Sequence, residues 1–270
     1  MDLKWIAVMV VGFIAAMVGM NKQKAGVAWG QILAILGAIV AVGGAAMNLT
    51  GFFQEGSKQM AREQRYMYVQ AKFLAEAVKK EAPSAQKVAV ICDSYLYIDG
   101  YGDPLPKAGD SPYIEAIKDT FKGAEIVPVY IKYKVKKPAG ADSKNVMPPV
   151  MPGMMSSGQF KQIVADIKKA KCDVVINITQ FPMDCKLPAS LGLLKGTKIG
   201  FFAFCTADEL KFVFKDGGKQ CAEVVAAVMT KANGIYDDTI PSSDKKAFDR
   251  RFVLLEKGNY ETQMKVAMQK

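Results

Sequence analysis

Two long runs of uncharged, mostly apolar residues at the amino end constrain this chain more than any other feature. The first extends from Trp5 to Asn21, and the second extends from Ala25 to Gln54. A helix needs about 20 apolar residues to cross the hydrocarbon core of a bilayer, within a range of about 17 to 25. The sequence therefore predicts a two-helix transmembrane hairpin over residues 1–54, with spans at residues 4–21 and 27–49.

The first run also resembles a secretory signal peptide, because the short stretch MDLK precedes its apolar core. No convincing small-x-small cleavage site follows this run, and a second long apolar run comes next. We therefore favour the hairpin, and cleavage of the first run is the alternative.

Small residues recur at four-residue spacing in the second run. The two series are Gly30, Ala34 and Ala38, and Gly37, Ala41 and Ala45. Such series let helices approach closely in lipid. They predict packing of membrane helices either within one hairpin or between hairpins of different chains. The expected partners are thus the lipid bilayer and, through the second option, other copies of this chain or other membrane proteins.

Charge and cysteine usage favour the cytoplasm for the rest of the chain. Two spans place both chain ends on one side of the membrane, and this side carries more basic residues near the spans than the connecting loop does. The basic residues on the chain-end side are Lys4, Lys58, Arg62 and Arg65. The more basic side faces the cytoplasm, and five cysteines without a disulfide-like spacing suit a reducing compartment. We expect a bacterial inner membrane protein with a cytoplasmic domain, and a periplasmic domain is the alternative.

Residues 55–84 are rich in good helix formers and end in a proline-bearing stretch. Met60, Met67, Leu74 and Val78 recur at helical spacing. We expect one connecting helix here, which leads from the membrane into a domain and is partly solvated on its charged sides.

Residues 85–270 alternate short apolar runs with helical patterns, which predicts a single α/β domain. The expected strands lie at residues 87–94, 124–135, 172–180, 197–205 and 250–259. Helices are expected between them, the last one at residues 218–234. The pattern favours a Rossmann-like, mostly parallel five-stranded sheet covered by helices. Pro128 cannot donate to a sheet ladder, so the second strand should lie at an edge.

Two sequence segments within residues 85–270 resemble those of a known fold. One contains the strand CDVVINI after a helix, and the other contains KIGFF after a helix. Together with the first two strands, over residues 87–204, they resemble one lobe of the type 1 periplasmic binding protein fold of ABC-transporter substrate-binding proteins. The resemblance implies ligand binding between two lobes. These residues hold one lobe, so capture in such a cleft would need two chains.

No motif in the sequence indicates a particular reaction. The chain has no histidine, which excludes Ser-His-Asp and Cys-His nucleophile systems and histidine metal sites built from these residues. It has no phosphate-binding loop, and no dinucleotide fingerprint follows the first strand. We therefore expect no cofactor and no metal site. Nucleic acid is not an expected partner, since no module with interleaved aromatic and basic residues is present.

Polar residues follow the predicted strands at the point where each strand ends. Open parallel sheets bind ligands beyond the carboxyl ends of their strands, so these residues are candidates for a small-molecule site. They are Asp93, Ser94, Tyr95, Thr179, Gln180, Cys205 and Thr206. The alternative is an ordinary surface, because Thr206 and Glu209 have the spacing of a capping box and Thr206 then serves a helix start.

Cys205 is a candidate nucleophile at these strand ends. It precedes an expected helix start, where the helix dipole lowers the pKa of a thiol. The sequence shows no general base beside it. A hydrolase or transferase that uses Asp93 or Cys205 is the only form of enzyme that the sequence suggests.

Two further segments stay open. The Met- and Pro-rich residues 145–155 are expected to form a loop with hydrophobic contacts, with partner docking and Cu(I) binding by thioethers as alternatives. The lysines between residues 132 and 137 are expected on a solvated surface, with contact to anionic lipid headgroups as the alternative.

From these features we predict a membrane-anchored, non-enzymatic interaction or assembly component. The alternative is a small-molecule-binding sensor or transport accessory protein that uses the residues at the strand ends.

Overall fold

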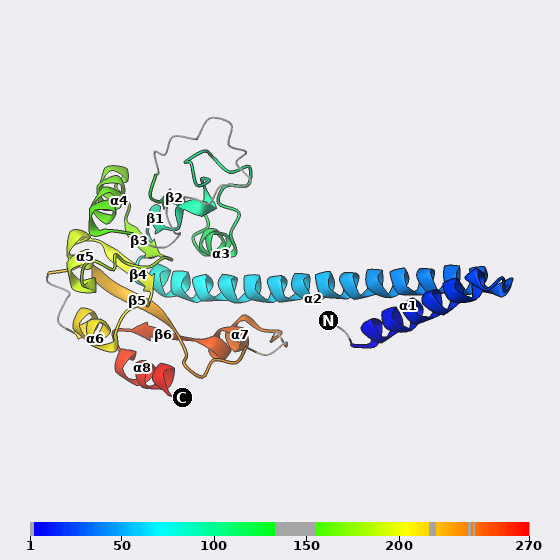
Figure 1. Cartoon of the computed structure of the whole chain (residues 1–270). Coiled ribbons are helices and arrows are strands. Elements are labelled where there is room, and N and C mark those ends of the chain that lie inside the picture. Colours follow the sequence, from blue (N-terminus) through cyan, green and yellow to red (C-terminus); the bar gives the residue numbers. More distant parts are fainter. Residues whose placement is uncertain (1–2, 133–154, 216–219, 237–238, 240, 270) are drawn as a thin grey trace. The chain divides into compact units, whose positions relative to one another are not determined.

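The computed structural model describes residues 3–132, 155–215, 220–236, 239 and 241–269. It contains two compact units, Met1–Glu63 and Gln64–Lys270. The helices and strands are labelled along the chain in Figure 1. The Met- and Pro-rich segment, apart from Met155, and most of the lysine-rich strip lie outside the described residues.

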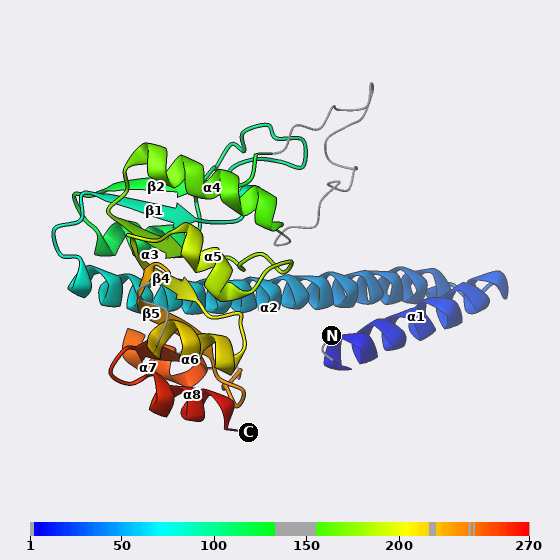
Figure 2. The same cartoon turned by 90° about the vertical axis from the view of Figure 1, so that its left-hand side faces the viewer.

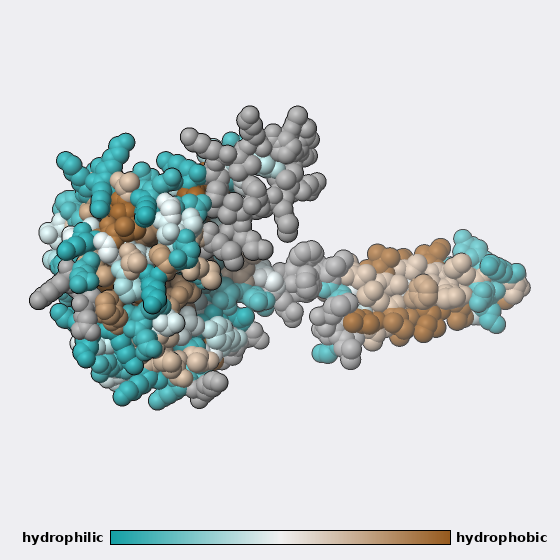
Figure 3. All heavy atoms as spheres, turned by 60° about the vertical axis from the view of Figure 1, so that its left-hand side comes forward, coloured by the Kyte–Doolittle hydropathy of each residue, from teal (hydrophilic) through white to brown (hydrophobic). Residues whose placement is uncertain are grey.

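The first unit contains two apolar helices. They are α1 (Leu3–Lys24) and the amino-terminal part of α2 (Trp29–Glu81). The stretches Lys4–Lys24 and Trp29–Asn48 are long and apolar enough to cross a membrane. Figure 3 shows apolar side chains over this hairpin, with hydrophilic side chains gathered at one end. The predicted apolar hairpin is thus present in the structure.

The two helices of the hairpin pack through glycines spaced seven residues apart. The buried glycines are Gly12 and Gly19 in α1, and Gly30, Gly37 and Gly44 in α2. A Cβ atom on Gly12 would lie 2.5 Å from the backbone nitrogen of Ala41, and one on Gly19 would clash with the backbone of Ala34. The backbones approach so closely that larger residues do not fit at these positions.

The second unit is built on a six-stranded sheet with the order β2-β1-β3-β4-β5-β6. The strands are β1 (Lys87–Ile91), β2 (Glu125–Val129), β3 (Val174–Asn177), β4 (Lys198–Phe202), β5 (Glu223–Thr230) and β6 (Phe252–Glu256). Strands β1 to β5 are parallel, and β6 runs antiparallel to β5. The predicted mostly parallel α/β sheet is confirmed, and Pro128 lies in the edge strand β2, as expected.

Helices cover both faces of this sheet. One face packs against α4 (Ser157–Ala170), α5 (Leu187–Leu193), α6 (Ala207–Lys215) and α8 (Tyr260–Met268). The other packs against α3 (Pro112–Thr120), α7 (Asp244–Arg251) and the carboxyl-terminal part of α2. Figure 2 looks onto the first of these faces, with α4 and α5 in front of the strands.

The carboxyl-terminal part of α2 is a core element of the second unit. Tyr66, Val69, Leu74 and Val78 are each at most 2% exposed. Leu74 and Val78 pack on β4 where Gly200 leaves room, since a Cβ atom on Gly200 would clash with Val78 and lie 3.0 Å from Cδ1 of Leu74. The compact unit therefore begins at Gln64, whereas the sequence placed the domain boundary at residue 85.

The prediction of five strands is wrong by one, because β5 occupies residues for which the sequence predicted the helix 218–234. This stretch mixes alanine with valine, and alanine is the best helix former. In the structure its valines and alanines are buried on both faces of the sheet, between β4 and β6. Burial on both faces gives a continuous apolar run without strand alternation, so the pattern alone did not distinguish strand from helix.

We expect Gly200→Val to destabilise the second unit by about 1–3 kcal/mol, because the added side chain overpacks the contact between α2 and β4. Gly258→Val is the matched control, since a Cβ atom there has nothing within 4 Å. Urea denaturation of the full chain in detergent micelles, followed by far-UV circular dichroism, compares the two. Equal midpoints for both variants would show that the close contact at Gly200 does not limit stability.

Candidate functional site

The carboxyl ends of β1 and β3 form the point where the sheet changes direction. The chain goes from β1 to β2 on one side and returns to β3 on the other. In open α/β sheets a crevice opens at such a point, and ligands bind there. Ile91 of β1 pairs with Asn177 of β3, so the residues just beyond these two lie close together.

Asp93 and Thr179 meet at this point. The hydroxyl of Thr179 donates a hydrogen bond of 2.9 Å to Oδ1 of Asp93. Burial raises the pKa of the Asp93 carboxyl, while hydrogen bonds from Thr179 and Tyr95 act in the opposite direction. The result is a half-buried carboxylate held by two hydroxyl groups, which is a good acceptor for a donor group on a ligand.

Asn177, the last residue of β3, adds a polar group that the sequence analysis missed. It is 0% exposed. Its Oδ1 accepts a hydrogen bond of 3.1 Å from the backbone nitrogen of Thr179, so its amide group lies toward the strand end. Its Nδ2 has no hydrogen-bond partner among the described residues. The sequence signal by which Asn177 could have been recognised is its position as a polar residue at the end of an otherwise apolar strand.

Alternation along the strands places these side chains on one face. Ile91 and Val175 lie in the core between the sheet and the helices α4 and α5. Asp93, Asn177 and Thr179 are each an even number of residues from them and so point to the same face. The structure therefore brings together three polar side chains from two neighbouring strands. We call this group the switch-point site: Asp93, Asn177 and Thr179.

Apolar side chains are exposed around the same edge of the sheet. Tyr95 is 50% exposed, Met183 is 73% exposed and Phe204 is 56% exposed. They follow β1, β3 and β4, which are neighbours in the sheet. Exposed aromatic residues beside convergent polar groups are typical of a binding surface.

The other predicted site residues lie at this edge without joining the group. Ser94 begins the short 3-10 helix Ser94–Leu96, and Gln180 is exposed. Thr206 and Glu209 form the predicted capping box at the start of α6, with the Thr206 backbone nitrogen donating to Glu209 at 3.1 Å. Cys205 lies before this helix and is half-buried.

The expectation that the helix start lowers the pKa of Cys205 is wrong. Burial raises the pKa of this thiol to about 12, and the negative charge of Glu209 adds to the rise. Since the thiolate is the nucleophilic form, Cys205 is unsuited to nucleophilic catalysis near neutral pH.

Four helices begin at this edge. Side chains of the chain itself occupy the starts of α4, α5 and α6, whereas the start of α3 at Ser111 has no side-chain cap. Ser156 and Gln159 form a complete capping box on α4. Asp184 accepts from the backbone nitrogen of Ser157 at 2.8 Å. Glu209 accepts from Thr206 at the start of α6 and from the backbone nitrogen of Leu187 in α5, the latter at 3.1 Å. The backbone donors that bind phosphate in many α/β proteins are thus partly taken at these helices.

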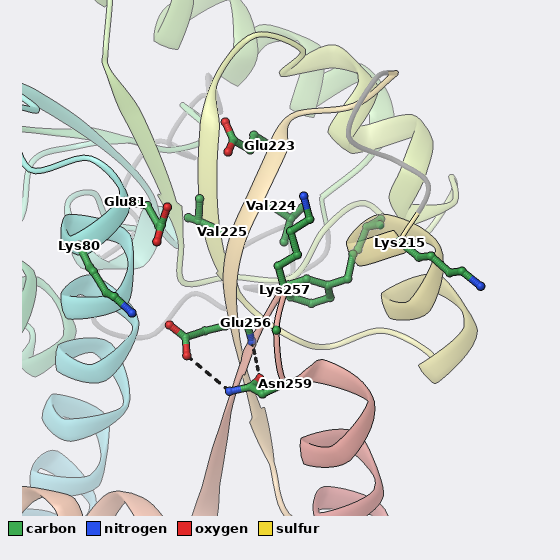
Figure 4. Close-up of a pocket in the computed structure, with 12 residues that line it drawn as sticks. Lys80, Glu81, Lys215, Glu223, Val224, Val225, Glu256, Lys257 and Asn259 are labelled. Carbon is green, nitrogen blue, oxygen red and sulfur yellow. Dashed lines mark hydrogen bonds between the residues drawn. The ribbon is translucent and has the colours of Figure 1, made fainter.

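A surface hollow of about 550 Å³ lies at the opposite, amino-terminal edge of β5 (Figure 4). Side chains of both signs line it, among them Lys80, Glu81, Glu223 and Lys257. The labelled charged side chains point in different directions, and Asn259 is bonded to Glu256. Among the described residues no group of three histidine, cysteine or carboxylate side chains is placed to hold a metal ion. We assign no chemistry to this hollow.

We expect Asp93→Asn to raise the melting temperature at neutral pH. Burial raises the folded-state pKa of Asp93 above the ordinary 3.8. The free energy of unfolding therefore falls as the pH rises from the ordinary pKa through the raised pKa, and stays lower above it. The gain from Asp93→Asn should shrink as the pH falls below the ordinary pKa.

Thermal denaturation of the full chain in detergent at several pH values measures this gain. Asp208→Asn is the control at the same edge, because its side chain is 95% exposed. A lower melting temperature for Asp93→Asn at neutral pH would mean that the ionised carboxylate stabilises the fold.

No family model matches the chain, and no curated protein matches it. The resemblance to one lobe of the type 1 periplasmic binding protein fold therefore rests on the pattern of helices and strands alone.

Proposed function

We propose that this protein is a membrane-anchored binding protein that holds a small polar molecule at the switch-point site. The observation that carries the proposal is the buried Nδ2 of Asn177, which has no hydrogen-bond partner among the described residues. Oδ1 of the same amide accepts from the backbone nitrogen of Thr179, whose hydroxyl donates to the half-buried carboxylate of Asp93. Leaving a buried donor unpaired costs about 1–3 kcal/mol. A ligand oxygen that accepts from this group would remove that cost.

The same residues support binding more than catalysis. The raised pKa of Cys205 leaves little thiolate for nucleophilic attack. Asp93 accepts a hydrogen bond from the hydroxyl of Thr179, which fixes the carboxylate in a position where it can also accept from a ligand donor. We therefore propose a non-enzymatic role, such as a sensor or a transport accessory protein.

An interaction or assembly role is the second candidate. The small-residue series no longer favours it, because Gly30, Ala34, Gly37 and Ala41 lie against α1 of the same hairpin and Ala38 is exposed. What favours it is the exposed apolar edge formed by Tyr95, Met183 and Phe204, defined above. Such residues also suit contact with a partner protein.

A thermal-shift screen of polar metabolites against the full chain in detergent tests the binding proposal. We expect at least one compound to raise the melting temperature, with the shift lost in Asn177→Leu and kept in Gln180→Ala. Asn177→Leu preserves the volume of the side chain and removes its polar atoms. If no compound acts and the protein self-associates in a manner that Phe204→Ser abolishes, the assembly role is the better account.

We further propose that the chain lies in a bacterial inner membrane with its α/β unit in the cytoplasm. The two apolar helices and the basic residues near the chain-end side of the spans support this placement. Labelling of Asp166→Cys, in a chain whose own cysteines are replaced, measures it, since Asp166 is exposed on α4. We expect a membrane-impermeant maleimide to react only after cell lysis. Reaction in intact or outer-membrane-permeabilised cells would place the unit in the periplasm.

A further inference from the structure

The starts of α4, α5 and α6 beside the switch-point site disfavour an anionic ligand. Anions often bind to free backbone donors at helix starts. The starts of α4 and α6 already carry complete side-chain caps, and Glu209 and Asp184 add negative charge there. At these helix starts a phosphate or carboxylate group would have to displace these carboxylates or lie beside them. The start of α3 at Ser111 has no side-chain cap.

The charge of the surrounding loops also favours a cationic ligand over an anionic one. The loops that follow β1 and β3 carry the cations Lys107 and Lys186. Their carboxylates are more numerous. They are Asp93, Asp99, Asp103, Asp110 and Asp184. Lys132 lies in the described part of the loop after β2. The carboxylates that follow β1 and β3 attract cations to the switch point, although the chain as a whole has a net charge of +10.

Aromatic side chains stand on both sides of β3. Tyr95 follows β1 and Phe204 follows β4, and each exposes about half of its surface, 50% and 56% respectively. The face of an aromatic ring attracts an ammonium group by about 0.5–1 kcal/mol at exposed sites. An aromatic ring on the ligand would also find apolar contact here.

We propose that the ligand of the switch-point site is a small organic cation that also carries a neutral oxygen. Its ammonium group would donate to the carboxylate of Asp93, and its oxygen would accept from Nδ2 of Asn177. Because Nδ2 is covered in the structure, binding requires a small movement of the side chains over it. This inference rests on the proposed binding function and specifies the class of ligand.

Three compounds with one skeleton test the charge of the ligand. Phenylethanolamine, phenylethanediol and mandelate each carry a phenyl ring and a hydroxyl group, and differ by an ammonium, a second hydroxyl or a carboxylate. Titration calorimetry with the full chain in detergent measures the binding of each. We expect phenylethanolamine to bind most tightly and mandelate most weakly.

Variants then locate the binding. Asp93→Asn should weaken phenylethanolamine binding by about tenfold or more, because a charge-assisted hydrogen bond is lost. This variant is expected to fold, since it is predicted to be more stable than the parent chain at neutral pH. Asp208→Asn removes an exposed carboxylate of the same edge and should leave the affinity unchanged within about twofold, since an exposed charge contributes little.

The possible results separate the two proposals. Tighter binding of phenylethanediol or mandelate than of the amine, with loss in Asn177→Leu, would overturn the cation inference and keep the site. Binding of the amine that Asp93→Asn leaves unchanged would overturn the cation inference as well. Failure of phenylethanolamine to bind at any soluble concentration would also overturn it, while the metabolite screen decides the binding function separately.

Discussion

The packing of the carboxyl-terminal part of α2 against the sheet is the contact on which the α/β unit depends. Tyr66, Leu74 and Val78 are fully buried there, and each large apolar side chain contributes about 1.5–3 kcal/mol when it leaves water. Gly200 allows the helix to lie close to β4. Lys72 and Arg65 then pair with Asp244 and connect α2 to α7. The helix that begins as an apolar span thus ends as part of the domain core.

The order of the strands decides where the polar side chains of the switch-point site gather. Because β1 has β2 on one side and β3 on the other, the chain leaves β1 toward α3 on one face of the sheet and leaves β3 toward α5 on the other. Ligands bind at such points in open α/β sheets. Strand register pairs Ile91 with Asn177, and the hydroxyl of Thr179 donates a hydrogen bond to Asp93. Within the part of the chain that the structure describes, this edge carries acceptor oxygens, an amide donor without a partner and exposed aromatic rings. This combination is why we favour a donor-bearing organic ligand over a nucleotide or another anion.

Several features could be predicted from sequence because their causes are local. The hairpin follows from two uncharged runs, and the edge position of β2 follows from Pro128, which has no N–H to donate. The cap at Thr206 depends on Glu209, three positions further along the chain. Other features escaped prediction because their causes are distant. Residues 223–230 form a strand because β4 and β6 enclose them, and the burial that raises the pKa of Cys205 involves residues remote in sequence.

The sequence by itself determined an apolar two-helix segment, an α/β domain with parallel strands, and polar residues at the strand ends. Hydrophobic period and length, proline chemistry and capping spacing are all properties of neighbouring residues, so they can be recognised without a structure. Only the tertiary structure decided that the carboxyl-terminal part of α2 belongs to the core and that Asp93, Asn177 and Thr179 converge. It also decided which small residues of α2 face α1. Those outcomes depend on which surfaces meet, and residues 86 positions apart, such as Asp93 and Thr179, come together only through the pairing of strands.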